Sequence, residues 1–220
     1  MIIEQSPTVY NTGHKVGQFF SSPCNRFAYI PIPKCASTWA SKFLTTGLDW
    51  LISDSKHIKT PIGSLFYEET YSCTDAHKLV ILRNPLDRWA SGMAQYLAMK
   101  HPGILVKTRE LQDFIFGRID FDPHTVPQVN YLSDLDTDDI TFFRFDDKLE
   151  QNLKTWIKTN TYKESDIEVF RNDSKTIKNK YMATQNLKSL LECNDVWLEA
   201  VKTYYKLDIE LYNTVKFYGI

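Results

Sequence analysis

Three short runs of strand-forming apolar residues punctuate the chain: FAYIPI at 27–32, KLVILR at 78–83 and ITFFRF at 140–145. Each run is followed by a segment in which apolar residues recur at helical spacing. The three helical series are Trp39, Phe43, Leu44 and Leu48; Leu86, Trp89, Met93 and Leu97; and Leu149, Leu153, Trp156 and Ile157. The pattern therefore predicts three strands, each followed by a helix.

Alternating strands and helices favour right-handed βαβ units. We therefore expect an α/β protein, three-layered α/β/α with a central parallel sheet, whose ligands bind beyond the carboxyl ends of the strands. The stretch from about Ala183 to Tyr218 has the apolar spacing of packed helices and is predicted to be structural. Because no repeat, low-complexity stretch or glycine-rich linker divides the sequence, we expect one domain over residues 1–220.

Composition narrows the possible partners. Lys and Arg number 26 against 27 Asp and Glu, so the net charge of −1 provides no overall field for nucleic acid. Any anion site must be local. No signal-peptide pattern or run of about 18 apolar residues is present, so we expect no membrane span. Four irregularly spaced cysteines predict neither a disulfide framework nor a zinc site and favour a cytoplasmic protein.

The loop after the first predicted strand has the residues of a phosphate cradle, Pro33-Lys34-Cys35-Ala36-Ser37-Thr38-Trp39. Backbone N–H groups at a helix start are unpaired, and the helix dipole adds positive potential. Lys34 supplies a full charge, and Ser37 or Thr38 can cap the helix and bind an oxyanion. This is not a Walker A motif, because the lysine precedes the small residues. Taken alone, the loop is equally well interpreted as a capped turn without a ligand.

A second candidate anion site follows the second predicted strand, where Arg83 is followed by Asn84, a good N-cap residue. An arginine beside a helix start suits phosphate, since its planar fork matches two phosphate oxygens. Asn84, Arg88 and Ser91 fall at i, i+4 and i+7, which predicts a polar stripe on the helix. For Arg83 alone, a surface ion pair with an acid such as Asp87 is an equal alternative.

Together, PIPKCASTW and ILRNPLDRWASGMAQY resemble the two signature segments of sulfotransferases that use 3′-phosphoadenosine 5′-phosphosulfate (PAPS). DPHTVPQ at 122–128 and YYKLDIELY at 204–212 look like segments of the carbohydrate sulfotransferases, including relatives of the heparan 2-O and chondroitin types. FFRFDDKLEQNL is similar to the family's late strand and helix, and FRNDSKTIK to the stretch that closes over the 3′-phosphate. The resemblance covers most of the chain and implies the P-loop-like sulfotransferase fold.

The resemblance also implies a reaction, in which a sulfuryl group passes from PAPS to an acceptor hydroxyl on a carbohydrate and PAP is released. The cradle is then expected to bind the 5′-phosphosulfate through Lys34, Cys35, Ala36, Ser37, Thr38 and Trp39. Arg83 and Ser91 are expected to bind the 3′-phosphate, with Lys175 as a further contact. Lys34 would stabilise charge on the bridging oxygen, and no metal is required.

Ala36 stands where many relatives have glycine, so it is expected to adopt an ordinary negative φ. Cys35 lacks the following arginine of a cysteine phosphatase loop and is interpreted as a small loop residue. Trp39, Trp89 and Trp156 lie on predicted core faces, although the resemblance places Trp39 at the donor site.

His124 is the expected general base, because imidazole titrates near neutral pH. Its His-x-x-Pro-Gln context also resembles the segment that carries a catalytic histidine in some carbohydrate-type relatives. Glu68, Glu69, His57 and His77 are the other candidates, in weaker sequence contexts. Without the family context, His124 is most simply a surface or turn residue.

Two other functions stay open at this point. A Mg²⁺-dependent nucleotide or nucleoside phosphotransferase needs carboxylates at a second strand end, which Arg144-Phe145-Asp146-Asp147 offers. A non-catalytic nucleotide- or glycan-binding module would keep the cradle without turnover. The acceptor could also be a lipid or a small alcohol, and the oligomeric state has no local signature in the sequence.

Overall fold

A computed structural model of the chain describes residues 1–4, 19–24, 26–53, 57–59, 65–67, 76–100, 124–132, 134–161 and 175–219. Its strands are β1 (Phe19–Ser21), β2 (Phe27–Ile30), β3 (Leu51–Ser53), β4 (His57–Lys59), β5 (Leu65–Tyr67), β6 (His77–Leu82) and β7 (Ile140–Arg144). Its α-helices are α1 (Ser37–Leu48), α2 (Pro85–Lys100), α4 (Leu149–Thr161), α5 (Lys175–Glu192), α6 (Asp195–Tyr204) and α7 (Lys206–Thr214). Two 3₁₀ helices, η2 (Gln128–Tyr131) and η3 (Thr137–Asp139), complete the described elements.

The main sheet has the strand order β3-β1-β2-β6-β7. The three predicted strands are confirmed as β2, β6 and β7, and they pair in parallel. The expected central parallel sheet is confirmed for these three strands only, because β1 runs antiparallel to both β2 and β3 and makes the sheet mixed. The short connection from Ser21 to Phe27 explains the difference, since parallel neighbours need a crossover of a dozen or more residues.

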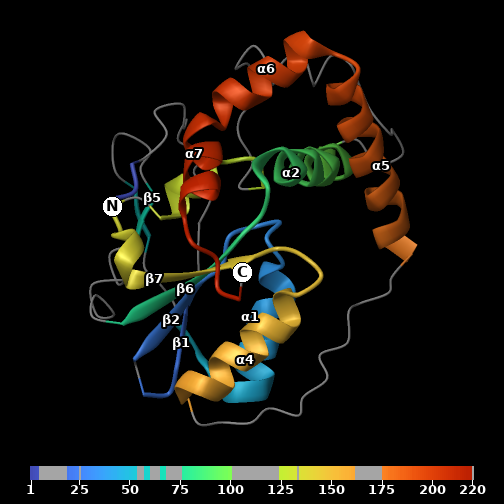
Figure 1. Cartoon of the computed structure of the whole chain (residues 1–220). Coiled ribbons are helices and arrows are strands. Elements are labelled where there is room, and N and C mark those ends of the chain that lie inside the picture. Colours follow the sequence, from blue (N-terminus) through green and yellow to red (C-terminus); the bar gives the residue numbers. More distant parts are fainter. Residues whose placement is uncertain are drawn as a thin grey trace.

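Helices lie on both sides of this sheet, with α1 and α4 on one side and α2 and α7 on the other (Figure 1). Trp156 of α4 packs edge-on against Phe27 and Phe143, with ring centroids 4.8 and 6.3 Å apart. On the other side, Arg144 at the end of β7 donates a hydrogen bond to the Tyr212 hydroxyl of α7 over 2.8 Å. Because side chains alternate across a strand, Phe143 and Arg144 of β7 reach opposite layers. The architecture is therefore α/β, as predicted.

The C-terminal helices pack around α2. α5 packs along α2, and α6 and α7 then return toward the sheet (Figure 1). After α7, Phe217 bridges Phe142 in parallel and the Tyr218 N–H donates to the Phe142 carbonyl over 2.8 Å. The tail thus covers the outer edge of β7, which would otherwise leave unpaired backbone groups.

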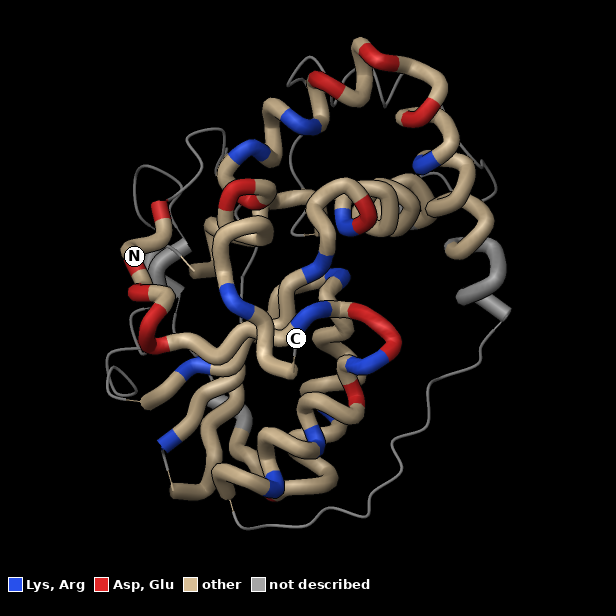
Figure 2. Tube along the Cα trace, in the orientation of Figure 1, with Lys and Arg blue, Asp and Glu red and all other residues tan. Residues whose placement is uncertain are grey.

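The described residues agree with the balanced charge and moderate apolar content of the whole sequence. Helices α4 and α6 each carry charged residues of both signs (Figure 2). No helix within the described ranges is long and apolar enough to cross a membrane. The thiols of Cys24, Cys35 and Cys193 are all free.

Candidate functional site

A cavity of about 450 Å³ opens at the carboxyl ends of β2 and β6, where ligands of parallel sheets bind. It is lined by residues of both predicted anion loops and by the expected base: Pro33, Lys34, Ala36, Ser37, Thr38, Trp39, Arg83, Ser91, Gln95, His124 and Phe145. Two segments with more than forty residues of sequence between them, 33–39 and 83–95, therefore meet at one site together with His124. Their meeting follows from the parallel pairing of β2 with β6, which brings both strand ends to the same edge.

The cradle loop is strained. Lys34 has φ 69° and Ala36 has φ 57°, so both lie in the left-handed region. The expected negative φ of Ala36 is therefore wrong; the chain must reverse sharply between β2 and α1, and a left-handed residue makes that turn. For a residue with a Cβ this conformation costs roughly 1–2 kcal/mol. Strained non-glycine positions of this kind cluster at ligand-binding sites, and turns with such residues form backbone nests for anions.

Neither Ser37 nor Thr38 caps α1. The N-cap position belongs to Ala36, which has no side-chain hydrogen bond, and Ser37 is the first helical residue. The prediction of a hydroxyl cap is wrong by one residue, because the left-handed turn ends later than the sequence indicated. The first N–H groups of the helix are consequently left without a side-chain acceptor beside the cavity.

Arg83 follows β6 and lies partly buried between the two loops. Its Nη1 donates to the Lys34 carbonyl over 3.2 Å, and its guanidinium carbon lies 4.6 Å from the centroid of the Phe145 ring. Its buried Nε has no hydrogen-bond partner, and burial lowers the pKa of Arg83. Asp87, the alternative ion-pair partner, pairs instead with Lys188 of α5. The guanidinium therefore keeps donor capacity beside the cavity.

The start of α2 matches the prediction, but its polar stripe does so only in part. Asn84 is confirmed as the cap, since its Oδ1 accepts from the Leu86 and Asp87 N–H groups over 3.1 and 3.3 Å. Ser91 lines the cavity. Arg88, in contrast, is wholly buried.

Arg88 binds the cradle loop from the protein interior. Its Nε donates to the Pro33 carbonyl over 3.0 Å and its Nη1 to the Val126 carbonyl over 2.6 Å. One buried guanidinium thus ties the cradle loop to the segment that follows His124. The sequence could not separate this role from that of Arg83, because both are arginines near a helix start.

His124 is half-buried beside α2 and owes its place to a glycine. A Cβ at Gly92 would overlap the carbonyl oxygen of His124, so only glycine lets the segment pack directly on the helix. The next residue, Thr125, is held by a hydrogen bond from the Tyr205 hydroxyl to its carbonyl. Sequence reasoning missed Gly92, although a glycine inside a predicted helix is itself a signal of close approach.

Cys35 points away from the cavity. It is wholly buried, and its Sγ donates to Oε1 of Gln128 over 3.2 Å. Burial is the largest cause that raises the pKa of this thiol to about 11. This position agrees with the interpretation of Cys35 as a small loop residue. It does not agree with a contact between the Cys35 side chain and the donor.

Trp39 is partly buried rather than core, and its ring stacks on Phe43 with centroids 5.5 Å apart. Trp89 and Trp156 are in the core, as predicted. Sequence reasoning also missed Gln95 and Phe145 of the cavity lining, which no motif distinguished.

Of the remaining candidates for the general base, only the side chain of His77 is among the described residues, and it does not line this cavity. His77 begins β6, at the end opposite Arg83, and its Nε2 lies 2.7 Å from the Thr141 hydroxyl. Glu68 and Glu69 lie outside the described residues, as do the side chains of His57 and Lys175. Asp146 accepts a hydrogen bond from the Lys148 N–H over 2.9 Å in the turn after β7. Among the described residues, no three potential metal ligands lie together.

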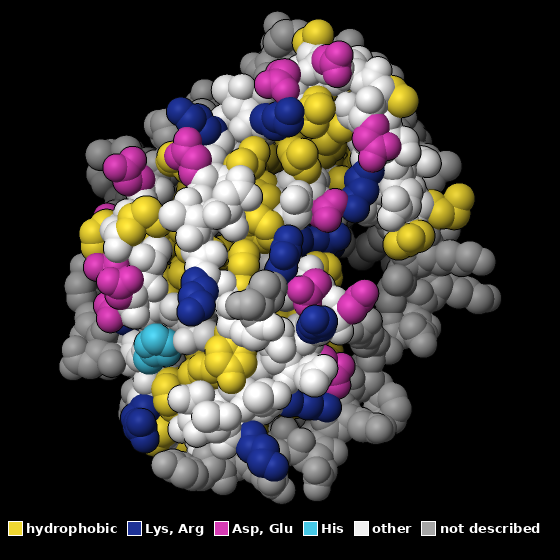
Figure 3. Space-filling model, viewed as in Figure 1, with side chains coloured by type: hydrophobic (Ala, Val, Ile, Leu, Met, Phe, Trp, Pro, Cys, Tyr) yellow, Lys and Arg dark blue, Asp and Glu magenta, His cyan; other side chains and the backbone are white. Residues whose placement is uncertain are grey.

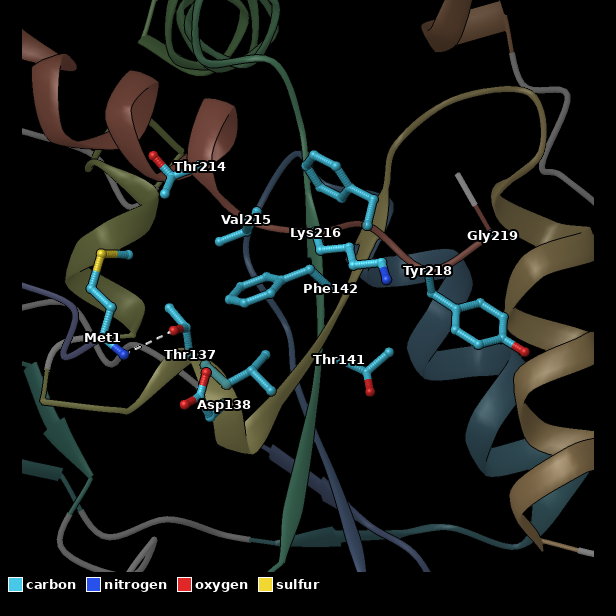
Figure 4. A pocket seen from close by; sticks show the side chains of 12 residues that line it. Met1, Thr137, Asp138, Thr141, Phe142, Thr214, Val215, Lys216, Tyr218 and Gly219 are labelled. Carbon is cyan, nitrogen blue, oxygen red and sulfur yellow. Dashed lines mark hydrogen bonds between the residues drawn. The ribbon is translucent and has the colours of Figure 1, made fainter.

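A second cavity, of about 660 Å³, contains none of the predicted site residues. It lies along β7, between η3 and the C-terminal tail, and Figure 4 shows Thr137 and Asp138 on one side and Lys216 on another. Its lining combines isolated charges of both signs with threonines and aromatic rings, so it lacks the grouped cations of the first cavity. Figure 3 shows Lys and Arg side chains gathered at the centre of the displayed face, with acidic side chains close by.

Comparison with known proteins adds no assignment. No protein-family model matches the sequence, and no curated protein or solved structure is similar enough to count as a match. The residues of the cavity and the resemblance of the motifs are therefore the two indications of function.

Proposed function

We propose that the protein is a sulfotransferase that moves a sulfuryl group from PAPS to an acceptor hydroxyl, with PAP as the second product. One observation carries the proposal: a single cavity combines the start of α1, Lys34, Arg83 and Ser91 with His124. The P-loop-like, three-layer arrangement of the sulfotransferase fold belongs to the same proposal.

The lining fits a donor with anionic groups at two ends. Among the described residues that line the cavity, none is an aspartate or glutamate, whereas Lys34 and Arg83 are cationic. The start of α1 and Lys34 suit the 5′-phosphosulfate, because helix N–H groups and a point charge both bind oxyanions. Arg83, with its unpartnered Nε, and Ser91 suit the 3′-phosphate.

The proposed chemistry is an in-line displacement. His124 accepts the proton of the acceptor hydroxyl as its oxygen bonds to sulfur and the bond between sulfur and the 5′-phosphate oxygen breaks. Lys34 stabilises the negative charge that develops on this departing oxygen, and the N–H groups of α1 hold the nonbridging oxygens. The electron pair of the broken bond leaves with PAP.

A carbohydrate is the proposed acceptor, as the sequence resemblance implies. Gln95 supplies an amide to the lining, and the ring of Phe145, 38% exposed, supplies an apolar face. This combination suits a ring that carries hydroxyl groups.

Calorimetry without metal tests the proposal, by comparing PAP with ADP and ATP. We expect PAP to bind more tightly than ADP, since only PAP has a 3′-phosphate. Arg83→Ala should weaken PAP binding about 10- to 100-fold, the range for a lost charge-assisted hydrogen bond. Arg26→Ala is the control, because Arg26 lies over the Phe27 ring at the opposite end of the sheet.

Other outcomes would redirect the assignment. Stronger binding of ATP with Mg²⁺ than of PAP would support the phosphotransferase alternative. PAP binding without transfer to any alcohol or carbohydrate acceptor would support a non-catalytic module.

A further inference from the structure

One buried amide, the side chain of Gln128, connects the two anion-binding halves of the cavity. These halves are the cradle loop at Lys34 and the site of Arg83 and Ser91. Oε1 of Gln128 accepts from the Arg83 N–H over 3.0 Å and from the Cys35 Sγ over 3.2 Å. Its Nε2 donates to the Arg83 carbonyl over 2.9 Å. The Gln128 side chain therefore binds both the N–H and the carbonyl of Arg83. It also binds the cradle loop through Cys35.

Gln128 is itself held from α7. The carboxylate of Asp208 accepts from the Gln128 N–H over 2.8 Å and from the Val129 N–H over 2.9 Å. Its Oδ2 also lies 3.5 Å from Nε2 of Gln128. Both side chains are about 1% exposed, so water does not compete for these bonds. The chain of contacts runs from α7 through η2 to both strand ends.

This arrangement requires an amide at position 128. The N–H and carbonyl of Arg83 need an acceptor and a donor at the same time, and glutamine presents both. A glutamate would place a second acceptor against the Arg83 carbonyl and a second negative charge near Asp208. An apolar residue would leave several buried polar groups unsatisfied.

We propose that Gln128 is a positioning residue that sets the separation of the two anion-binding halves, with Asp208 as its support. The inference rests on the proposed function, because its readout is the recognition of PAP. Neither residue lines the cavity, so neither touches the donor. Their effect passes through Arg83 and the cradle loop.

The ratio of PAP affinity to ADP affinity depends on the separation of the two anion-binding halves. PAP spans both halves of the cavity, whereas ADP lacks the 3′-phosphate and engages the cradle alone. In Gln128→Glu and Asp208→Asn we expect the ratio to fall about tenfold or more, the order that a displaced charge-assisted contact predicts. ADP affinity should change less than PAP affinity. Calorimetry at low temperature in sucrose keeps destabilised variants folded.

Asn194→Ala is the matched stability control. Asn194 caps α6, where its Oδ1 accepts from the Trp197 N–H over 3.1 Å, and it is not in the cavity lining. This variant should melt at a lower temperature and keep the wild-type ratio. If Gln128→Glu does not fold, Asp208→Asn decides, because it leaves the Gln128 side chain in place without its support.

The possible failures are distinguishable. If the wild-type protein shows no preference for PAP over ADP, the proposed function itself fails. If the wild type prefers PAP and both variants keep its ratio within twofold while melting earlier, as in Asn194→Ala, the positioning role is overturned and Gln128 is structural only.

Discussion

His124 is the residue on which the proposed chemistry depends most directly. It is a half-buried imidazole on the wall of a cavity that also holds two cations, Lys34 and Arg83. Both cations favour an anionic ligand beside the imidazole, as the proposed PAPS donor would be.

We expect His124→Ala to lower turnover by about 10²- to 10⁴-fold, the usual contribution of a general base, with PAP affinity nearly unchanged. Transfer from PAPS to a panel of carbohydrate acceptors measures this. His77→Ala is the control, because His77 lies at the far end of β6. Turnover within a few-fold of wild type would remove His124 from the mechanism and return attention to Glu68 and Glu69.

Single residues also show where sequence reasoning stopped. Lys34, Arg83, Ser91 and His124 were predicted site residues and meet in one cavity. The left-handed φ of Ala36 was not predicted, because alanine normally avoids that region. The closure of the turn between β2 and α1 imposes it, and closure is a property of the assembled fold.

Among the elements, α2 does the most to shape the site. It carries Ser91 and Gln95 on the cavity side and presents Gly92 to the backbone of His124. The helix and the histidine segment can approach this closely only without a side chain between them. The position of α2 therefore fixes the position of the His124 backbone.

We expect Gly92→Ala to push the His124 segment away from α2. The added methyl would overlap a backbone carbonyl, so we expect unfolding to become easier by about 1–3 kcal/mol, as in overpacked interiors. Turnover should fall as well, since His124 moves. Gly47→Ala near the end of α1 is the control, where helix propensity predicts slight stabilisation. Denaturant melts and transfer assays give both quantities, and a stable, fully active Gly92→Ala would contradict this packing.

Short elements escaped prediction for a simple reason. β1 and β3 have three residues each, too few for a period of two to be recognised. Their pairing is antiparallel and joins them to the parallel core. By contrast, α1, α2 and α4 each repeat the apolar spacing over several turns, and all three occur where the pattern placed them.

At the scale of the whole molecule, a ligand that binds the folded state alone stabilises all of it. With PAP at about a hundredfold excess over its dissociation constant, the expected gain is about 2.7 kcal/mol. For a chain of this size that corresponds to a rise in melting temperature of about 5–10 °C. Thermal scanning with PAP and with ADP measures it. Equal shifts with the two nucleotides would contradict a 3′-phosphate site at Arg83.

The sequence alone determined the local features of this protein. Apolar periodicity is a property of neighbouring residues, so the three strand and helix pairs could be predicted from it, as could the Asn84 cap and the composition of the two anion loops. The motif resemblance then indicated which residues share one site and what they act on, and the sulfotransferase activity stays a prediction.

Only the tertiary structure decided how these parts meet. The separate positions of Arg83 and Arg88 and the Gln128–Asp208 contact depend on residues far apart in the sequence. The antiparallel pairing of β1 and the left-handed φ of Ala36 are also imposed by the assembled fold. Side-chain type does not show which buried groups will face each other, because each buried donor or acceptor takes the partner that packing brings to it. The cavity exists because those partners place two strand ends, one helix start and one histidine together.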